Sequence, residues 1–327
     1  MSDNGKNLMN LTTKEDLELI AKDKGYRPEI LEKVYRLLDF IEEIMAIDYL
    51  KDRLVLKGGT AINVFCTHEL PRLSVDLDFN YIGSSDRETM LTDKKEIDTL
   101  ISVLCHKKQY DIYRNPGAHA GGKMVLIYTS LLGRGGRLEL DLNYLYRTPL
   151  WTPEWQYSAD WLHNIGVRVL NIHELAAGKL HALLGRIASR DLFDSHKLLT
   201  SWPLEREKLR QAFTVYAGMS KNGWREINKG IIQLDLKDIK NKLIPVLQQD
   251  FIPGTKSNDI KLWGEKLITE CQTALQIVLP FNEHEINFLN ALEQGIIKPE
   301  LLSPDNMFCQ AVASHPALLW RVQQKKF

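Results

Sequence analysis

The sequence lacks the features of an exported, disulfide-rich or membrane-spanning protein. Its few cysteines form no CxxC pair and stand singly at Cys66, Cys105, Cys271 and Cys309. This scatter argues against a zinc site and a disulfide framework, and it indicates a reducing compartment. No stretch approaches ~18 consecutive apolar residues, and the N-terminus has acids where a signal peptide would have an apolar core. We therefore expect a cytoplasmic protein with no membrane partner.

An excess of charge of one sign is also absent. Lys+Arg and Asp+Glu both number 42, so the formal net charge is +0. No global field would attract nucleic acid, membranes or acidic substrates, and any polyanion must be bound by a local patch. The phosphate-binding patterns GxxxxGK[ST] and GxGxxG are missing as well. The 327 residues, 44% of them hydrophobic, are nevertheless enough to bury two sizeable cores.

Hydrophobic periodicity predicts an α+β fold in which a mixed first half precedes a helical second half. Helical spacing begins at Pro28, which suits a first helical turn. The later segments expected in the first half are a strand at 54–56, a strand at 72–82, a helix at 86–107 and strands at 109–114, 123–132 and 137–145. We interpret 148–155 as a loop, and from about residue 171 the pattern is helical. The expected parts are 1–50, 51–165 and 166–327.

Two of these strands carry an acidic face. Because side chains alternate along a strand, the first has Arg72, Ser74, Asp76, Asp78 and Asn80 on one face. The second has Glu139, Asp141 and Asn143 on one face in the same way. Either strand alone would be interpreted equally well as an ordinary amphipathic strand whose acidic face is solvated.

If the two strands are neighbours, their carboxylates gather in one region, where like charges disfavour joint ionisation unless a cation is present. Carboxylate oxygens suit Mg²⁺, which usually shares its ligand shell with substrate phosphates. Phosphoryl or nucleotidyl transfer is the chemistry that follows. Asp76 and Asp78 are the expected ligands, and spacing does not choose between Glu139 and Asp141 for the third.

A glycine turn precedes these strands at Lys57–Gly58–Gly59–Thr60, where a strand passes into a helix. Backbone N–H groups and the Thr60 hydroxyl could hold a phosphate at such a helix start. A Gly-Gly pair in this position is often only a turn with a cap. Its place shortly before Asp76 favours the phosphate site.

A basic stripe is predicted on the segment 173–194, which reads as one helix. At ~100° per residue, Lys179, Arg186, Arg190 and Asp194 share one face. The alternative is a solvated stripe in which Arg190 and Asp194 form an ordinary surface pair. Beside the carboxylate strands, the cations would neutralise phosphates and Asp194 would orient a cation or base. Asp191 lies off the stripe and is expected to be structural.

Four segments together resemble the AbiEii/AbiGii-type nucleotidyltransferase toxins, which belong to the DNA-polymerase-β superfamily and are similar to MenT-type toxins. They are KGGTAINVF at 57–65, RLSVDLDFNYIG at 72–83, RLELDLNYLYRTPLW at 137–151 and HELAAGKLHALLGRIASRDLFD at 173–194, so the resemblance covers roughly 50–200. It implies a polymerase-β-like domain with a mixed sheet at 51–165. N-terminal helices would pack on this domain, and the helical domain at 166–327 would carry the Lys179/Asp194 motif and the acceptor surface.

The resemblance also implies a site and an activity. Asp76, Asp78 and Asp141 would hold Mg²⁺, or Mn²⁺ in its place, and Lys179 and Asp194 would belong to the catalytic set. The expected contacts to nucleotide phosphates are Lys57, Gly58, Gly59, Thr60, Arg72, Ser74, Lys179, Arg186 and Arg190. A toxin of this kind would transfer NMP from an NTP to an RNA, namely the tRNA 3′ end, and would have a cognate antitoxin.

Two other interpretations of the same residues stay open. The acceptor could be a protein or a small molecule such as an antibiotic, since a near-neutral chain is compatible with either. The chain could also be a non-catalytic binding module that keeps the nucleotidyltransferase fold. The identity of the acceptor would decide the first alternative, and toxicity without any nucleotide would favour the second.

Overall fold

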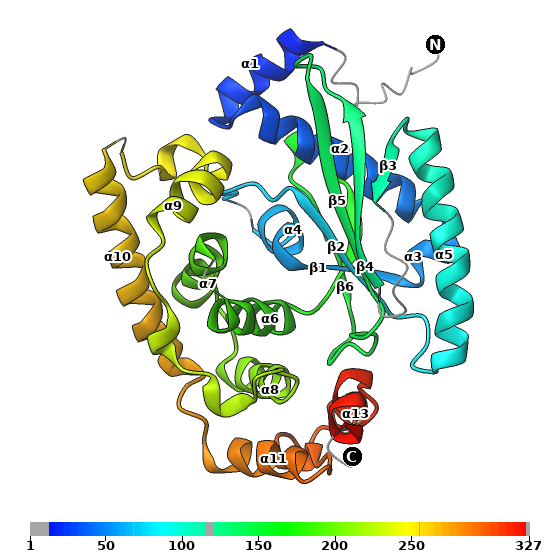
Figure 1. Cartoon of the computed structure of the whole chain (residues 1–327), viewed down its shortest axis with the longest axis vertical. Coiled ribbons are helices and arrows are strands. Elements are labelled where there is room, and N and C mark those ends of the chain that lie inside the picture. The colour runs from blue at the N-terminus through cyan, green and yellow to red at the C-terminus, as the bar shows by residue number, and fades with distance from the viewer. Residues whose placement is uncertain (1–12, 68, 115–120, 187, 255, 325–327) are drawn as a thin grey trace.

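A mixed sheet of seven strands forms the centre of the molecule (Figure 1). The computed structural model describes residues 13–67, 69–114, 121–186, 188–254 and 256–324. The strands are β1 Leu54–Lys57, β2 Asp76–Tyr81, β3 Asp111–Arg114, β4 Gly121–Thr129, β5 Gly135–Asn143, β6 Glu154–Tyr157 and β7 Gly166–Val169. Their order is β3-β4-β5-β2-β1-β7-β6. The pairs β2–β5 and β1–β7 are parallel and the other neighbours are antiparallel, so the predicted mixed sheet is confirmed.

Helices from the first part of the chain cover one face of the sheet. They are α2 Pro28–Met45, α3 Asp48–Lys51 and α5 Arg87–Lys107, and α1 Lys14–Lys24 packs against α2. The predicted alternation in β2 holds, because Leu77, Phe79 and Tyr81 are at most 1% exposed on this face. The Tyr81 hydroxyl donates to Asp93 of α5 at 2.7 Å, which ties the strand to its covering helix.

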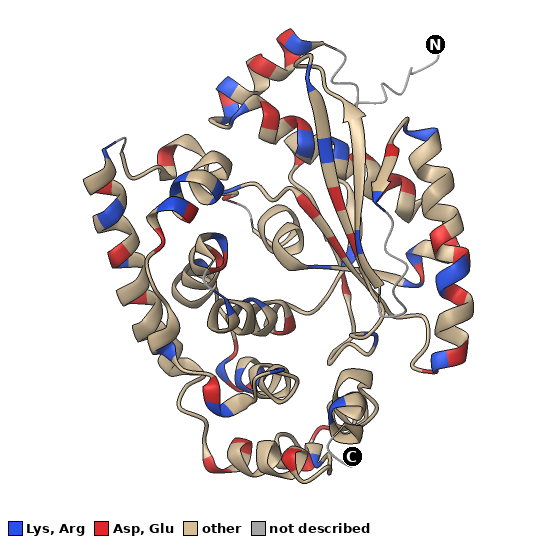
Figure 2. Cartoon of the chain, in the orientation of Figure 1, with Lys and Arg blue, Asp and Glu red and all other residues tan. Residues whose placement is uncertain are grey.

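The opposite face of β2 carries its polar side chains and meets three short or medium helices. The glycine turn forms α4, Gly58–Thr60, which continues as the π-helix η1 at Ala61–Phe65. Two further helices lie on this side, α6 Ile172–Gly185 and α7 Ser189–Ser201. Figure 2 shows Asp and Glu positions along the central strands and Lys and Arg positions scattered over the surrounding helices.

The rest of the chain is helical, as predicted. Its helices are α8 Arg206–Gly218, α9 Leu236–Asp238, α10 Ser257–Ala274, α11 Glu283–Glu293, α12 Asn306–Ala313 and α13 Pro316–Gln323. Short 3-10 and π segments are η2 Asp160–Leu162, η3 Trp224–Glu226, η4 Lys229–Ile231, η5 Ile239–Leu243, η6 Ile244–Val246, η7 Gln249–Phe251, η8 Leu275–Ile277 and η9 Pro299–Leu301. None of the helices in the described ranges is both long and apolar enough to cross a membrane.

Two features of the sheet differ from the sequence prediction. Strands β6 and β7 were not expected, and β6 begins inside the segment 148–155 that we interpreted as a loop. Both are only 4 residues long, which is too short for alternation to be recognised, and β7 pairs with β1 from a distant part of the chain. The segment 72–75 is not part of β2, because Arg72 instead forms an isolated bridge with Leu247. The division at 165/166 stays a prediction, although β7 beyond it belongs to the same sheet.

Candidate active site

The acidic strands β2 and β5 lie side by side and run parallel, which meets the condition on which the sequence interpretation depended. Their register places Asp78 opposite Asp141 and Asp76 opposite Glu139. Neighbouring strands are ~4.8 Å apart, so facing side chains lie close together. Asp78 and Asp141 line one cleft, and Asp76 and Asp78 line a second cleft beside it. Three carboxylates from two strands therefore border a common region.

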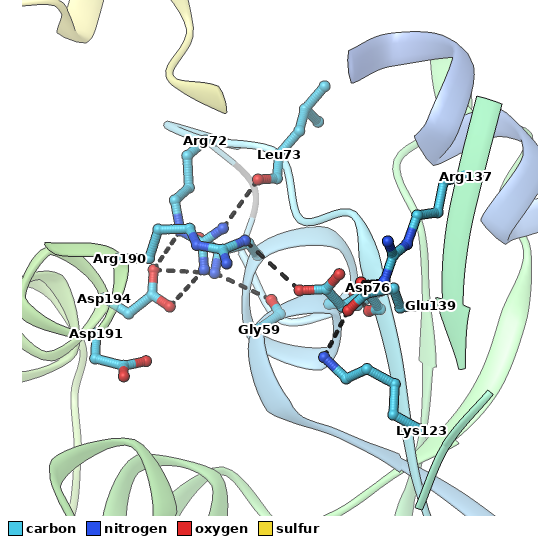
Figure 3. A network of polar contacts seen from close by, with 12 residues as sticks. Gly59, Arg72, Leu73, Asp76, Lys123, Arg137, Glu139, Arg190, Asp191 and Asp194 are labelled. Atoms are coloured by element: carbon cyan, nitrogen blue, oxygen red, sulfur yellow. Dashed lines mark hydrogen bonds and ion pairs between the residues drawn. The ribbon is translucent and has the colours of Figure 1, made fainter. Parts of the chain in front are cut away.

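Glu139, the alternative third carboxylate, is already neutralised. Lys123 donates to it at 2.6 Å and Arg137 at 2.8 Å (Figure 3). Burial alone would raise the pKa of Glu139, but these two cations outweigh it and hold the pKa below its ordinary value. Glu139 does not line either cleft, whereas Asp141 does. The geometry thus favours Asp141 over Glu139.

The remaining carboxylates are short of counter-charge. Burial raises the pKa of Asp78, Lys57 lowers it in part, and the charges of Asp76 and Asp141 raise it further. Arg190 approaches Asp76 at 3.6 Å, but no ion pair to Asp78 or Asp141 forms within the described residues. A carboxylate that is disfavoured by burial and by its neighbours attracts a cation.

The donor set fits a hard divalent cation by its chemistry. All three groups are carboxylates, which suit Mg²⁺ or Mn²⁺. The next residue on the same face of β2, Asn80, lines the same cleft as Asp78, and its buried Oδ1 has no hydrogen-bond partner in the part of the chain that the structure describes. The carboxylates do not yet have the spacing of a metal site, because no three Asp, Glu, His or Cys side chains in the described ranges are arranged to hold an ion.

The turn requires glycine because its backbone passes close to the Asp78 side chain. Gly58 has φ +72, and a Cβ there would come within 2.4 Å of Asp78 Oδ2. At Gly59, a Cβ would meet Ser74 Oγ at 2.9 Å and Arg72 Nη2 at 3.0 Å. Both glycines line the clefts, so their backbone is open to a ligand. Only residues without a side chain allow the turn to lie against the carboxylate.

Thr60 has a different position from the one we expected. Its side chain is 2% exposed, and its hydroxyl donates to the carbonyl of Asp76. The hydroxyl therefore connects the turn to β2 and does not face the clefts, as a phosphate contact would have to. A sequence pattern cannot distinguish the two roles, because both require a hydroxyl after the glycines.

A buried ion network lies next to the turn (Figure 3). Arg72 donates to the Asp194 carboxylate through Nε and Nη2, both at 2.6 Å, and the two side chains are almost fully buried. Lys179 pairs with Asp194 at 3.0 Å and with Asp191 at 3.0 Å. Burial alone would raise the pKa of Asp194, but Arg72 and Lys179 outweigh it and lower the pKa to about 2.

This network changes the roles assigned to its members. Arg72 was expected to contact phosphate, and it lines the side cleft, but its guanidinium nitrogens are occupied by Asp194 and by the carbonyl of Leu73. Asp191, expected to be structural, holds both Lys179 and Arg186. Lys179 remains at the cleft wall, and Arg186 extends into solvent with 67% of its side chain exposed. Among the described residues, the cations that border the clefts with access to a ligand are therefore Lys57, Arg186, Arg190, Lys242 and the edge of Lys179.

The segment 173–194 is two helices, not the single helix that we predicted. Helix α6 ends at Gly185 and α7 begins at Ser189. Asp238 accepts hydrogen bonds from the backbone N–H of Ser189 at 2.7 Å and from its hydroxyl at 2.6 Å, which caps α7 from a distant part of the chain. The surface pair between Arg190 and Asp194, which the alternative interpretation required, does not form, because Arg190 pairs with Asp76 and Asp194 pairs with Arg72.

The two clefts meet at Gly59, Asp78, Lys179 and Arg186. The larger, which we call the main cleft, has a volume of about 360 Å³ and the smaller, the side cleft, about 290 Å³. The side cleft is bordered by Asp76, Arg190 and Lys242. One end of the main cleft is lined by residues that sequence reasoning did not identify: Tyr146, Glu174, His181 and Tyr216. They come from separate elements, and no spacing pattern links them.

Comparison with known proteins gave a family and a fold. The model of the family described as "Nucleotidyl transferase AbiEii toxin, Type IV TA system" matches residues 39–259. No curated protein matches the sequence. Among solved structures, the MenT4 nucleotidyltransferase toxin of Mycobacterium tuberculosis H37Rv is similar, with a TM-score of 0.51 and 15% identity over 93% of this chain and 98% of that chain. At this identity, the likeness shows a common fold.

Proposed function

Because the chain belongs to the AbiEii family of nucleotidyltransferase toxins, we propose that it transfers NMP from an NTP to the 3′ end of an RNA, with tRNA as the acceptor and Mg²⁺ as the cofactor. The family makes the chain a nucleotidyltransferase of a toxin–antitoxin system, with an NTP as substrate and an antitoxin as partner. The observation that carries the proposal is the parallel register that sets Asp78 beside Asp141, with Asp76 on the same face.

Asp76, Asp78 and Asp141 would hold the metal. Their shortage of counter-charge supports this role, since Asp78 and Asp141 have no ion-pair partner within the described residues. Mg²⁺ bound there would polarise the α-phosphate and lower the pKa of the acceptor hydroxyl. Arg190, which faces Asp76 at 3.6 Å, would turn toward substrate phosphate when that carboxylate has another partner.

The cations around the turn would bind the departing pyrophosphate. Lys57 and the backbone of Gly58 and Gly59 line the main cleft next to Asp78. Arg186 lines both clefts and its side chain is largely exposed, so its terminal guanidinium nitrogens can reach a triphosphate while Nε stays bonded to Asp191. Fixed cations stabilise charge that develops on a leaving group because they need no reorganisation during the reaction.

The side cleft supports a polyanionic acceptor. Arg190 and Lys242 border it beside Asp76, and Lys242, which pairs with Asp238 at 2.7 Å, keeps 64% of its side chain exposed. Since the net charge of the chain is +0, an RNA end requires such a local group of cations. The acceptor would enter through the side cleft and meet the NTP of the main cleft at Asp78.

The test is RNA labelling by the purified protein. We would incubate it with total bacterial tRNA, Mg²⁺ and each NTP in turn, labelled on the α-phosphate. Label should enter the RNA with at least one NTP, and it should be lost with Asp76→Ala, with EDTA and with tRNA whose 3′ diol has been oxidised by periodate. Glu139→Gln is the matched control and should keep the label. No label with any NTP would contradict an RNA acceptor.

A further inference from the structure

One end of the main cleft is aromatic, and the proposed chemistry has no use for it. Tyr216 of α8 and Tyr146, which follows β5, have ring centroids 5.9 Å apart at 36°. His181 of α6 lies 6.4 Å from the Tyr216 ring. All three side chains line the cleft and are partly exposed. We call this group the aromatic end of the main cleft.

The rings of the aromatic end are held in place from behind. Tyr146 packs in an edge contact on His315, whose ring centroid is 5.7 Å away and which is 1% exposed. Tyr216 lies over Gly178 of α6, where a Cβ would stand 3.3 Å from the ring. The absence of a side chain at Gly178 gives the Tyr216 ring its space. Aromatic rings that are fixed in this way, and that are tilted by 36° to each other, each offer a face on which another flat ring can stack.

A buried carboxyl group lies beside these rings. Glu174 lines the cleft, accepts a hydrogen bond from the Leu150 backbone N–H at 3.0 Å and accepts a long one from the Tyr216 hydroxyl at 3.4 Å. Burial raises the pKa of Glu174 to about 8. At neutral pH the group is therefore mostly protonated, so it has an O–H donor as well as acceptor oxygens.

Helix α6 connects the aromatic end to the phosphate end. Glu174, Gly178, Ala182 and Arg186 follow one another at intervals of four residues and line the same cleft. At 1.5 Å per residue, α6 rises roughly 16 Å from Glu174 to its end at Gly185, the residue before Arg186. The cleft thus runs from cations and carboxylates at one end to aromatic rings and one buried polar group at the other, which matches the order of groups in a nucleoside triphosphate.

We propose that the aromatic end is the nucleobase pocket, in which the base of the NTP stacks on Tyr146 and Tyr216 and the Glu174 side chain selects the base through hydrogen bonds to its polar edge. This inference rests on the proposed function, since it takes the triphosphate to lie at Lys57, Gly58 and Gly59. It assigns the choice among the four NTPs to one carboxyl group and two rings.

The test separates binding of the base from binding of the phosphates. By calorimetry with Mg²⁺ and no acceptor, we would measure the affinities of the four NTPs and of inorganic tripolyphosphate, which has no base. The wild type should bind its preferred NTP more tightly than tripolyphosphate. Tyr216→Leu should weaken that NTP roughly ten-fold or more, as expected for a lost stacking partner, and leave tripolyphosphate unchanged. Tyr157→Leu removes a tyrosine that is 57% exposed on β6, outside the clefts, and should change neither.

Glu174 is tested by two variants. Glu174→Gln keeps one donor and one acceptor in a side chain of the same shape, so it should retain the wild-type order of the four NTPs. Glu174→Leu removes both and should bring the four affinities together. Unchanged binding of tripolyphosphate shows in each case that the phosphate end is folded, and Tyr146→Leu replaces Tyr216→Leu if the latter does not fold.

The outcomes distinguish this inference from the proposed function. Equal loss of NTP and tripolyphosphate affinity in Tyr216→Leu would overturn the inference, and so would an unchanged NTP order in Glu174→Leu, even if the wild type labels RNA. Conversely, base-selective binding that depends on Tyr216 would uphold the nucleobase pocket even if the wild type labels no RNA, in which case only the acceptor is wrong.

Discussion

Asp194 should stabilise the fold more than any of the proposed metal ligands does. Its carboxylate is 0% exposed and receives Nε and Nη2 of Arg72 and the ammonium of Lys179. Asp194→Asn keeps the shape of the side chain but leaves the buried Arg72 guanidinium without its anion. Removing one partner of a buried ion pair costs about 3–5 kcal/mol of unfolding free energy.

The pKa of Asp194 gives a second measure of the same interaction. Its fall from 3.8 to about 2 corresponds to roughly 2.5 kcal/mol in favour of the ionised group in the folded protein. Because the pKa of Asp194 is lower in the folded protein than in the unfolded chain, this stabilisation is present above pH 3.8 and is lost as the pH falls toward 2. Together the two figures predict that Asp194→Asn lowers the free energy of unfolding by about 3 kcal/mol at pH 7.

The assay is urea denaturation followed by the fluorescence of the 7 tryptophans, with Asp76→Asn as the matched control. Asp76 is 29% exposed and meets Arg190 only at 3.6 Å, so its substitution should change the free energy of unfolding by less than about 1 kcal/mol. Both variants should lose transferase activity, and only Asp194→Asn should lose stability. An Asp194→Asn protein as stable as the wild type but inactive would refute the structural role and assign Asp194 directly to the chemistry.

Three other substitutions test the site. In Gly58→Ala, the added Cβ would come within 2.4 Å of Asp78 Oδ2 at a backbone φ of +72. This variant should lower the single-turnover rate of RNA labelling at least ~ten-fold and lower the free energy of unfolding by roughly 1–2 kcal/mol. A normal rate would contradict the claim that the turn must lie against Asp78. Asp141→Asn should abolish RNA labelling and weaken Mn²⁺ binding measured by electron paramagnetic resonance, whereas Glu139→Gln should do neither, because two cations already neutralise Glu139. The pKa of Glu174 is about 8 in the folded protein and 4.5 in the unfolded chain. The free energy of unfolding should therefore fall by roughly 1.4 kcal/mol per pH unit as the pH rises between these two values. Glu174→Gln should remove this slope, as urea midpoints at pH 6 and pH 8 would show, and an unchanged slope would assign the pH dependence to another group.

The sequence predicted the acidic face because alternation along a strand is a local property. Leu77 and Phe79 could be assigned to the core from spacing alone, and their burial leaves Asp76 and Asp78 on the other face. The neighbouring position of the second strand was inferred only from its matching pattern. The register that sets Asp141 and not Glu139 opposite Asp78 is a tertiary feature, and no local pattern reveals it.

The incorrect expectations have a common physical cause, which is a partner from a distant part of the chain. The break before α7 depends on Asp238, which caps Ser189. Arg72 shares a face with Asp76 in an ideal strand, but its guanidinium is buried against Asp194. Helical spacing could place Lys179, Arg186 and Arg190 on one stripe only on the assumption that the helix is continuous. These long-range contacts bring most of the predicted residues to one site, and rules based on residue spacing cannot predict such contacts.

The buried network also explains how opposite charges coexist in the site without cancelling each other. Lys179 is near enough to Asp78 to lower its pKa, and an ammonium group with three donors and no partner of its own would move onto that carboxylate. Asp191 and Asp194 prevent this because they hold the Lys179 ammonium at 3.0 Å each. Asp194 also holds Arg72 away from the acidic strands. The carboxylates that we propose as metal ligands thus stay available for a cation, while the basic side chains stay directed at the cleft. In Asp194→Asn we therefore expect Lys179 to shift toward Asp78, so that affinity for Mn²⁺ falls together with stability. A variant that loses stability but binds Mn²⁺ as tightly as the wild type would show that the network supports the fold without keeping the charges apart.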